Sequence, residues 1–170
     1  GATFVPFTPC SWSYKKLIPI NKNKVSGTQT NFPVLISLSS DTDLQNHAQS
    51  SGNDIVFTAA DGSTQLPHEI ESYSAGTLVA WVKVLTITNL TDTTFYMYYG
   101  NPGAPNQQDT ANVWSGYEGV WHLNESGGSG AFIKDSTGKG HAGTPTLTSY
   151  LGSGKIGGAR EFTESFGGEY

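Results

Sequence analysis

The sequence contains little charge, little cysteine and no long apolar run. Lys, Arg, Asp and Glu make up 14% of the 170 residues, against about a quarter in an average domain, so long helices with charged outer faces are excluded. The single cysteine, Cys10, excludes an internal disulfide framework and a cysteine-based zinc site. No apolar run approaches the roughly 18 residues that span a bilayer, and residues 1–9 lack the basic segment of a signal peptide. We therefore expect no membrane insertion.

The balance of charge is acidic. Nine Lys and Arg residues against fourteen Asp and Glu residues give a net charge of −5. Surfaces that bind nucleic acid or anionic membranes are usually basic, so neither is an expected partner. The remaining composition, with 36% hydrophobic residues and 21 glycines, is typical of a folded chain. Its length suits one domain, or one domain and a further piece.

Short segments rich in β-branched and aromatic residues alternate with turn residues. This period of two predicts strands, and Asp61-Gly62 is typical of a hairpin turn. Helix is expected only over residues 41–50, with a short turn that begins at Asp109 and carries Val113 and Trp114 inward. The sequence therefore predicts an all-β fold, an antiparallel and jelly-roll-like β-sandwich with very little helix. The expected strands are residues 14–20, 33–39, 54–58, 65–72, 78–85, 93–99, 119–123 and 159–163.

A set of short motifs in the first two thirds of the chain resembles a known family. The motifs are NDIVFT at 53–58, DG at 61–62, LPHEIES at 66–72, AWVKV at 80–84 and YMYYGNP at 96–102. In order and spacing they resemble the domain-of-unknown-function family 2341, which occurs in secreted and surface proteins of bacteria and archaea. The resemblance covers roughly residues 12–105 and implies an extracellular or cell-surface protein.

A second resemblance begins after a connector that lacks large apolar residues. GVWHLNE at 119–125, KDSTGKGHAGT at 134–144 and GKIGGAREF at 154–162 are similar to the opening of a concanavalin A-like, laminin-G-like lectin domain. Such a domain is far longer, so this part is expected to be a partial lectin-like β segment with unpaired strand edges and an exposed apolar face. These surfaces are covered by the first sandwich, by a neighbouring subunit that adds a strand, or by the rest of a longer protein.

The expected organisation has four parts. They are an extended N-terminal arm over 1–11, a β-sandwich over 12–105, a connector over 106–118 and the partial lectin-like segment over 119–170. The arm carries Phe4, Val5 and Phe7, which are too apolar to remain in water, so they are candidates for self-association or for docking on their own domain. Cys10 is either an intermolecular disulfide partner or a buried, reduced thiol.

Three aromatic residues are the candidate carbohydrate-binding residues. Trp81 lies on one expected strand, and Tyr96 and Tyr98 lie on another. If they share an outer face, they form an aromatic platform on which sugars stack. The alternative is that a further layer covers them, or that the tyrosine hydroxyls reach water from half-buried rings.

Two carboxylates form the only pair that suggests catalysis. Glu69 and Glu71 alternate onto one face of a strand, about 7 Å apart, and glycosidases use paired carboxylates at comparable separations. Residues i and i+2 of one strand rarely face opposite sides of one bond, however. We therefore expect no catalytic residues and no enzyme, with a glycan hydrolase as the minor alternative.

The remaining candidates concern metals and glycans. Asp135 begins a segment, Asp-Ser-Thr-Gly, whose oxygen ligands are spaced as in calcium loops, but it lacks acidic density, and an ordinary Asx turn is the favoured interpretation. His68, His122 and His141 have no metal-ligand spacing. No cofactor is expected, with calcium as the weak alternative. Asn89 and Asn124 begin N-glycosylation sequons in expected surface turns.

Together these features predict a non-catalytic structural module outside the cell or on its surface. The partial second sandwich, the apolar arm and the low charge favour self-association into a filament or surface assembly by strand exchange. The expected partners are other copies or neighbouring domains of a longer surface protein. The alternative is a carbohydrate-binding, lectin-like adhesion module whose partners are glycans.

Overall fold

A computed structural model describes residues 7–127, 132–146 and 148–162 of the chain. It divides into two compact units, residues 1–113 and 114–170, and each is described by itself. Phe4 and Val5 of the N-terminal arm lie outside the described residues. Among the described helices, none has the length and apolar character needed to cross a membrane.

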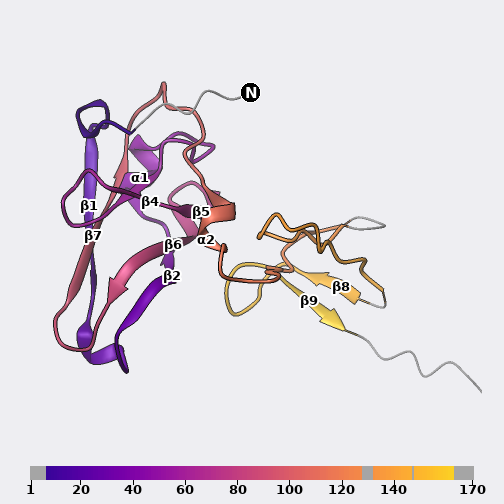
Figure 1. Ribbon diagram of the computed structural model, residues 1–170. Coiled ribbons are helices and arrows are strands. Elements are labelled where there is room, and N and C mark those ends of the chain that lie inside the picture. The colour runs from indigo at the N-terminus through magenta and orange to yellow at the C-terminus, as the bar shows by residue number, and fades with distance from the viewer. Residues whose placement is uncertain (1–6, 128–131, 147, 163–170) are drawn as a thin grey trace, which may run out of the picture. The chain divides into compact units, whose positions relative to one another are not determined.

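The first unit is built from two antiparallel sheets (Figure 1). The four-stranded sheet has the order β1-β7-β3-β4, and the three-stranded sheet has the order β2-β6-β5. Two short helices, α1 and α2, accompany the strands. The element bounds are β1 Tyr14–Ile20, β2 Gln29–Leu38, α1 Thr42–His47, β3 Val56–Thr58, β4 Gln65–Leu66, β5 His68–Ser74, β6 Thr77–Ile87, β7 Thr93–Tyr99 and α2 Thr110–Val113.

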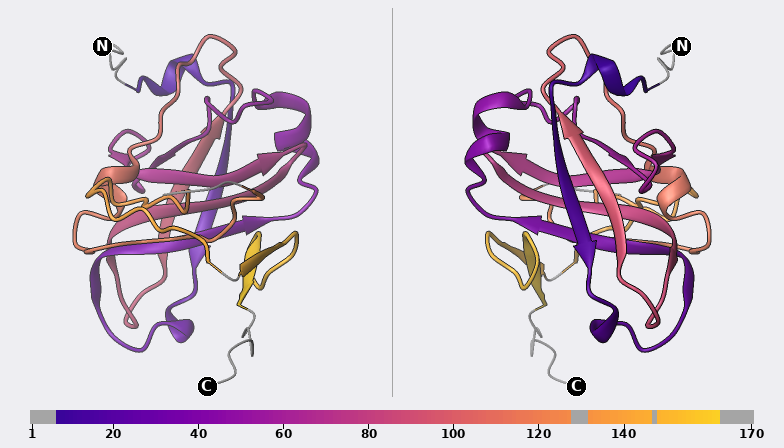
Figure 2. Two further views of the ribbon diagram at one scale, coloured as in Figure 1. Left: turned by 90° about the vertical axis from the view of Figure 1, so that its right-hand side faces the viewer. Right: turned by 90° about the vertical axis from the view of Figure 1, so that its left-hand side faces the viewer.

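The core lies between these two sheets, whose strands run across one another (Figure 2). Because side chains alternate across a strand, β6 turns Leu78, Ala80, Val82 and Val84 inward, and all four are buried. Buried side chains of the opposite sheet complete the core, among them Phe57, Phe95 and Met97. The expected all-β antiparallel sandwich is thereby confirmed.

A smaller apolar cluster covers the outer face of the four-stranded sheet. Phe7 lies with its ring centroid 4.8 Å from that of Trp12 and 5.1 Å from that of Tyr98, and Val56 and Ala104 belong to the same cluster. The described part of the N-terminal arm therefore docks on its own unit.

The buried carboxylate of Asp54 ties this cluster to the loops around it. Its Oδ2 accepts hydrogen bonds from the backbone N–H groups of Gly100 and Asn101 at 2.8 and 3.0 Å, and its Oδ1 accepts one from Gln49 N–H at 2.9 Å. The Asp54 carbonyl also accepts the indole N–H of Trp12 at 2.6 Å. A single carboxylate thus satisfies donors from two loops that are far apart in the sequence.

The observed elements differ from the expected ones in a few places. The strands expected at 14–20 and 93–99 form with those bounds, whereas β2 begins earlier and β5 contains a register shift between Ile70 and Ser72. Residues 106–113, expected to belong to a connector, pack on the sandwich: Gln108 Oε1 accepts Ile70 N–H at 2.6 Å, and Asp109 N–H donates to the His68 carbonyl at 2.9 Å. The strand expected over 119–123 does not form.

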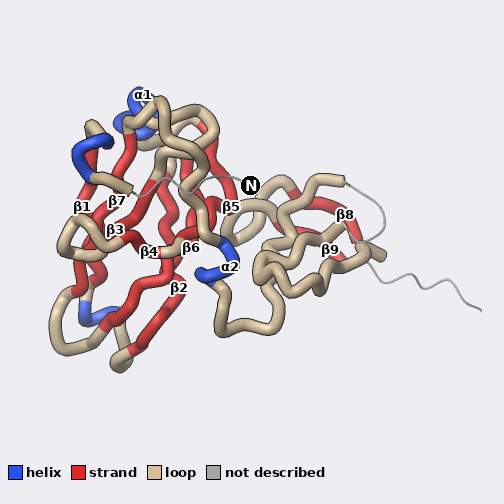
Figure 3. Tube along the Cα trace, turned by 45° about the horizontal axis from the view of Figure 1, so that its top comes forward, coloured by secondary structure: helices blue, strands red, loops and turns tan. Residues whose placement is uncertain are grey.

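The described part of the second unit contains one hairpin and much loop (Figure 3). Strands β8 Thr148–Leu151 and β9 Ala159–Phe162 pair antiparallel, in register from Thr148 opposite Phe162 to Leu151 opposite Ala159. Outside this hairpin, Ile133 and Gly143 exchange two backbone hydrogen bonds of 2.8 Å. Its described fold therefore depends on contacts between loops more than on a continuous sheet.

His68 is an ionisable side chain inside the first core. It is 1% exposed, and its ring packs edge-on against Phe57 at 5.3 Å. Burial lowers the pKa of His68 to about 4, and the backbone of Leu66 and Ile55 and the charge of Asp109 oppose this only in part. The neutral imidazole is therefore the form that the fold tolerates.

We expect His68 to make the first unit sensitive to mild acid. Its folded pKa of about 4 lies below the unfolded value of about 6.5, so the unfolded chain binds a proton first as the pH falls. The contribution of neutral His68 to the free energy of unfolding is therefore complete above about pH 6.5. It declines by about 3 kcal/mol as the pH falls towards 4. Urea unfolding followed across this range should show the decline, and His68→Leu should remove it.

The exposed His47 provides the control for this prediction. His47→Gln also removes one imidazole, but from an exposed ring that contacts Tyr14 at the surface, so it leaves the core unchanged. If His68→Leu and the parent lose stability equally over this range, the buried imidazole is not its cause.

Candidate functional site

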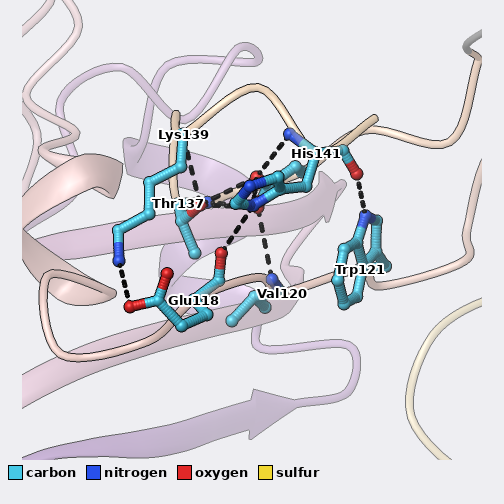
Figure 4. A network of polar contacts seen from close by, with 7 residues as sticks. Glu118, Val120, Trp121, Thr137, Lys139 and His141 are labelled. Atoms are coloured by element: carbon cyan, nitrogen blue, oxygen red, sulfur yellow. Dashed lines mark hydrogen bonds and ion pairs between the residues drawn. The ribbon is translucent and has the colours of Figure 1, made fainter. Parts of the chain in front are cut away.

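Asp135 is the centre of a hydrogen-bond network in the second unit. Figure 4 labels its partners Val120, Thr137 and His141. Asp135 Oδ1 accepts the backbone N–H groups of Val120 at 3.2 Å and Thr137 at 2.9 Å, and its Oδ2 accepts His141 N–H at 3.1 Å. The Thr137 hydroxyl lies 2.7 and 2.8 Å from the two oxygens. Burial would raise the pKa of Asp135, but these hydrogen bonds hold it well below its ordinary value.

A ring of further contacts surrounds Asp135. The Nδ1–H of His141 donates to the Glu118 carbonyl at 2.8 Å, and the His141 carbonyl accepts the indole N–H of Trp121 at 2.7 Å. Lys139 Nζ lies 3.0 Å from Glu118 Oε1, and this ion pair is exposed. The network joins residues 118–121 to residues 135–141, which otherwise share no regular sheet.

This geometry is that of a loop-organising Asx turn. Both oxygens of Asp135 face N–H or O–H donors, which leave little room for a cation to take them as ligands. Within the described residues, no group of three or more His, Cys, Asp or Glu side chains could hold a metal ion. The residues present therefore do not fit a calcium ion at Asp135.

Beside the network lies an open groove of about 400 Å³. Its walls include Trp121 and Phe162, which are 44% and 69% exposed. The guanidinium of Arg160 is held nearby, since its Nε–H donates to Thr148 Oγ1 at 2.9 Å and its Nη1–H donates to the Glu125 carbonyl at 2.8 Å. The groove is concave and mainly apolar, with few polar groups, which is the general form of a binding site. It is the candidate functional site of the second unit.

The structure does not bring the expected aromatic platform together. Trp81 lies on β6 of the three-stranded sheet, whereas Tyr96 and Tyr98 lie on β7 of the four-stranded sheet. Tyr98 is buried under Phe7 and donates its hydroxyl to the Gly62 carbonyl at 3.1 Å. The condition for a shared sugar-stacking face, a common outer surface, is therefore not met.

The carboxylate pair lies beside Trp81. Glu69 is 4% exposed and stands opposite Trp81 in the β5–β6 register, and Glu71 Oε2 accepts the Trp81 indole N–H at 2.9 Å. Residues 107–109 pack along the same strand, where Gln107 is buried. The geometry thus gives Glu71 a structural partner and places Glu69 away from solvent.

The other candidate residues fall into different environments. Asn89 lies exposed in the loop between β6 and β7, whereas Asn124 is half-buried in the second unit. His122 packs against Trp114, with ring centroids 5.9 Å apart. Cys10 is exposed and free, so the alternative of a buried thiol is wrong.

Sequence reasoning missed the main groove residues of the second unit. Arg160 and Phe162 lie in the motif at 154–162 and in the strand expected over 159–163, but no sequence signal assigns either residue to a site, and no strand is expected where β8 forms. Alternation along β9 places Arg160 and Phe162 on one face. Such a short pattern predicts a strand but does not predict what lines its face.

We predict that Asp135→Asn disrupts the second unit. An amide keeps one acceptor oxygen but presents an NH₂ group to the donors on the other side, which leaves donors facing one another. The backbone amides of Val120, Thr137 and His141 should lose protection in hydrogen exchange, while amides of β6 in the first unit should not change.

Glu118→Gln is the matched control for this prediction. It makes the same carboxylate-to-amide change in a side chain that is 91% exposed and forms a surface ion pair with Lys139, so exchange should stay close to that of the parent. Equal effects of the two substitutions would contradict a central role for Asp135.

Comparison with known proteins supports the first of the two expected resemblances. No curated protein and no solved structure matches the chain. The expected likeness to a lectin domain after the sandwich has no match that supports it. The segment that does match a family model, residues 51–128, begins and ends later than the expected 12–105. It contains β3 to β7, α2 and the beginning of the second unit. Residues 51–128 match the model of the family described as Domain of unknown function (DUF2341), as expected from the motifs within them.

Proposed function

We propose that the chain is a non-catalytic structural module that associates with other copies through its second unit. The observation that carries this proposal is the number of large apolar side chains that this small unit leaves in solvent. Among the described residues of this unit, six are between 37% and 69% exposed: Tyr117, Trp121, Tyr150, Leu151, Ile156 and Phe162.

The β8–β9 hairpin concentrates this exposure. Tyr150 and Leu151 lie on β8, and Phe162 lies on β9. Among the described residues neither strand pairs with a third, so both outer edges offer N–H and C=O groups to another strand. An isolated hairpin is marginally stable in water, and a further strand or an apolar cover stabilises it. Pairing with a second copy would supply both.

The absence of catalysis in this proposal rests on the environment of the carboxylates. Glu71 is bonded to the Trp81 indole and Glu69 is buried, which suits a role in packing. A place outside the cell or on its surface is supported by the motifs that resemble a family of secreted and surface proteins, and by the low charge of the chain.

A second candidate function is carbohydrate binding in the groove of the second unit. It is favoured by the two exposed aromatic rings in the groove walls, Trp121 and Phe162, next to the hydrogen-bonding guanidinium of Arg160. Aromatic faces with a few polar groups are the chemistry that a sugar ring requires. The likeness of residues 119–162 to a lectin-like opening is consistent with this candidate.

We predict that the chain forms oligomers whose size increases with protein concentration. The double substitution Tyr150→Glu with Phe162→Glu should reduce the size of these oligomers. Charges at these two exposed positions oppose burial of the hairpin. Light scattering after size exclusion, in reducing buffer because Cys10 is exposed, should show smaller species for the double variant.

Leu85→Glu with Leu90→Glu is the control pair, since both leucines are exposed at 51% and 73% on the first unit. This pair should associate like the parent. A parent chain that keeps the single-chain mass of 18.1 kDa at high concentration would contradict the proposed function.

The carbohydrate alternative has a separate expectation. If the groove binds glycans, a glycan array should detect binding by the parent chain and at least about tenfold weaker binding by Phe162→Ala, which removes a ring from the wall. The side chain is 69% exposed, so the substitution should not affect folding. Equal binding by both chains would exclude this wall as the sugar site.

A further inference from the structure

The sheet edges of the first unit are protected unequally. In the four-stranded sheet, edge strand β1 carries Lys15, Lys16 and Pro19, and edge strand β4 has two residues. Charges, proline and shortness are the usual protection against unwanted strand pairing. In the three-stranded sheet, residues 108–109 bond along edge strand β5.

Strand β2 lacks most of this protection. It runs from Gln29 to Leu38, forms an edge of the three-stranded sheet and contains no charged residue. Within the described part of the chain, its backbone pairs only with β6. Pro33 has no N–H group to donate, so residues 34–38 are the stretch best suited to accept another strand.

An apolar groove runs beside this edge. It has a volume of about 300 Å³ and lies between β1 and β2, with Leu17, Ile18, Leu35 and Leu38 in its walls. Leu17 is 52% exposed. The charge in the wall is that of Lys16, whose ammonium pairs with Asp41. The groove therefore presents apolar surface, and its cation is neutralised within the same unit.

We propose that residues 34–38 of β2 pair antiparallel with the same segment of a second copy, about a two-fold axis. A backbone edge accepts an extended strand, because only such a strand aligns its N–H and C=O groups with those of the edge. The segment Val-Leu-Ile-Ser-Leu is uncharged, so pairing with itself brings no like charges together. Each copy also covers the groove of the other.

This inference rests on the proposed function and adds a second contact to it. A two-fold contact alone closes into a dimer, but two different contacts on one chain alternate and form an open filament. The hairpin of the second unit and the β2 edge would be the two contacts.

The test separates these contacts by using the Tyr150→Glu, Phe162→Glu chain as background. Association of this background chain should stop at the dimer, twice the single-chain mass of 18.1 kDa, because the β2 contact remains. Adding Ser37→Lys should weaken the dimer at least about tenfold, since it places like charges on both sides of the new strand pair. Ser37 is exposed on β2, so the fold should tolerate lysine.

Thr86→Lys is the matched control. Thr86 is exposed on the central strand β6 of the same sheet, and lysine there should leave the dimer intact. Hydrogen exchange supplies a readout at the backbone: amides of residues 34–38 should gain protection as the concentration of the background chain increases.

Each result has a definite meaning. Loss of the dimer with Ser37→Lys but not with Thr86→Lys, together with protection of residues 34–38, supports the β2 contact. A dimer that survives Ser37→Lys, or unchanged exchange of these amides, overturns the β2 contact and leaves self-association standing. A background chain that is monomeric while the parent oligomerises also overturns it, and a monomeric parent overturns both proposals.

Discussion

The backbone groups at the edges of β-sheets are the constraint on which this structure depends. Each edge strand leaves a row of N–H and C=O groups that need partners. In the first unit, lysines and a proline on β1 and the short length of β4 oppose pairing with another strand, and residues 108–109 bond along β5. β2 is long and uncharged and has one proline, and within the described residues the β8–β9 hairpin pairs with no third strand. The proposed association therefore follows from the same physical need that forms the sheets.

Buried or partly buried carboxylates organise the loops of this weakly charged chain. Asp54 accepts four hydrogen bonds through its side chain and carbonyl, which joins the loops at 49 and 100–101 to Trp12. Asp41 caps α1 by accepting Leu44 N–H at 3.1 Å. Asp135 holds the loops of the second unit. In each case a carboxylate gathers donors that lie beyond the reach of a sheet, so a fold with much loop keeps a defined shape.

The sequence predicts the strands of the first unit well, because local alternation and pairing agree there. β1 and β7 form with the expected bounds and pair along their whole length, from Tyr14 opposite Tyr99 to Ile20 opposite Thr93. The expected strand at 119–123 contains apolar residues at suitable positions, yet Val120 N–H binds Asp135 and the Val120 carbonyl accepts Ser136 N–H. The Asp135 carboxylate and the Ser136 N–H group thus take the backbone groups of Val120 that a sheet would need.

The aromatic platform illustrates what alternation alone cannot predict. Alternation places Trp81 and Tyr98 on the faces of their strands that point away from the core, as the structure also does. Alternation does not show which sheet each strand joins. β6 pairs with β2 and β5, and β7 pairs with β1 and β3, so the two outer faces belong to different layers. Long-range pairing is set by the packing of the whole sandwich.

The two units would contribute differently to the proposed assembly. The first has a filled core in which Leu44, Phe57, Leu78 and Val82 are fully buried, so it can keep its shape when its β2 edge is occupied or free. Among its described residues the second has few buried apolar side chains, and it leaves Trp121 and Phe162 in solvent. In the proposed assembly, covering those rings would lower the free energy of this unit, so association and completion of its fold would be one event. The two proposed contacts would then differ in strength, and the weaker one would set the concentration at which the assembly grows beyond the dimer.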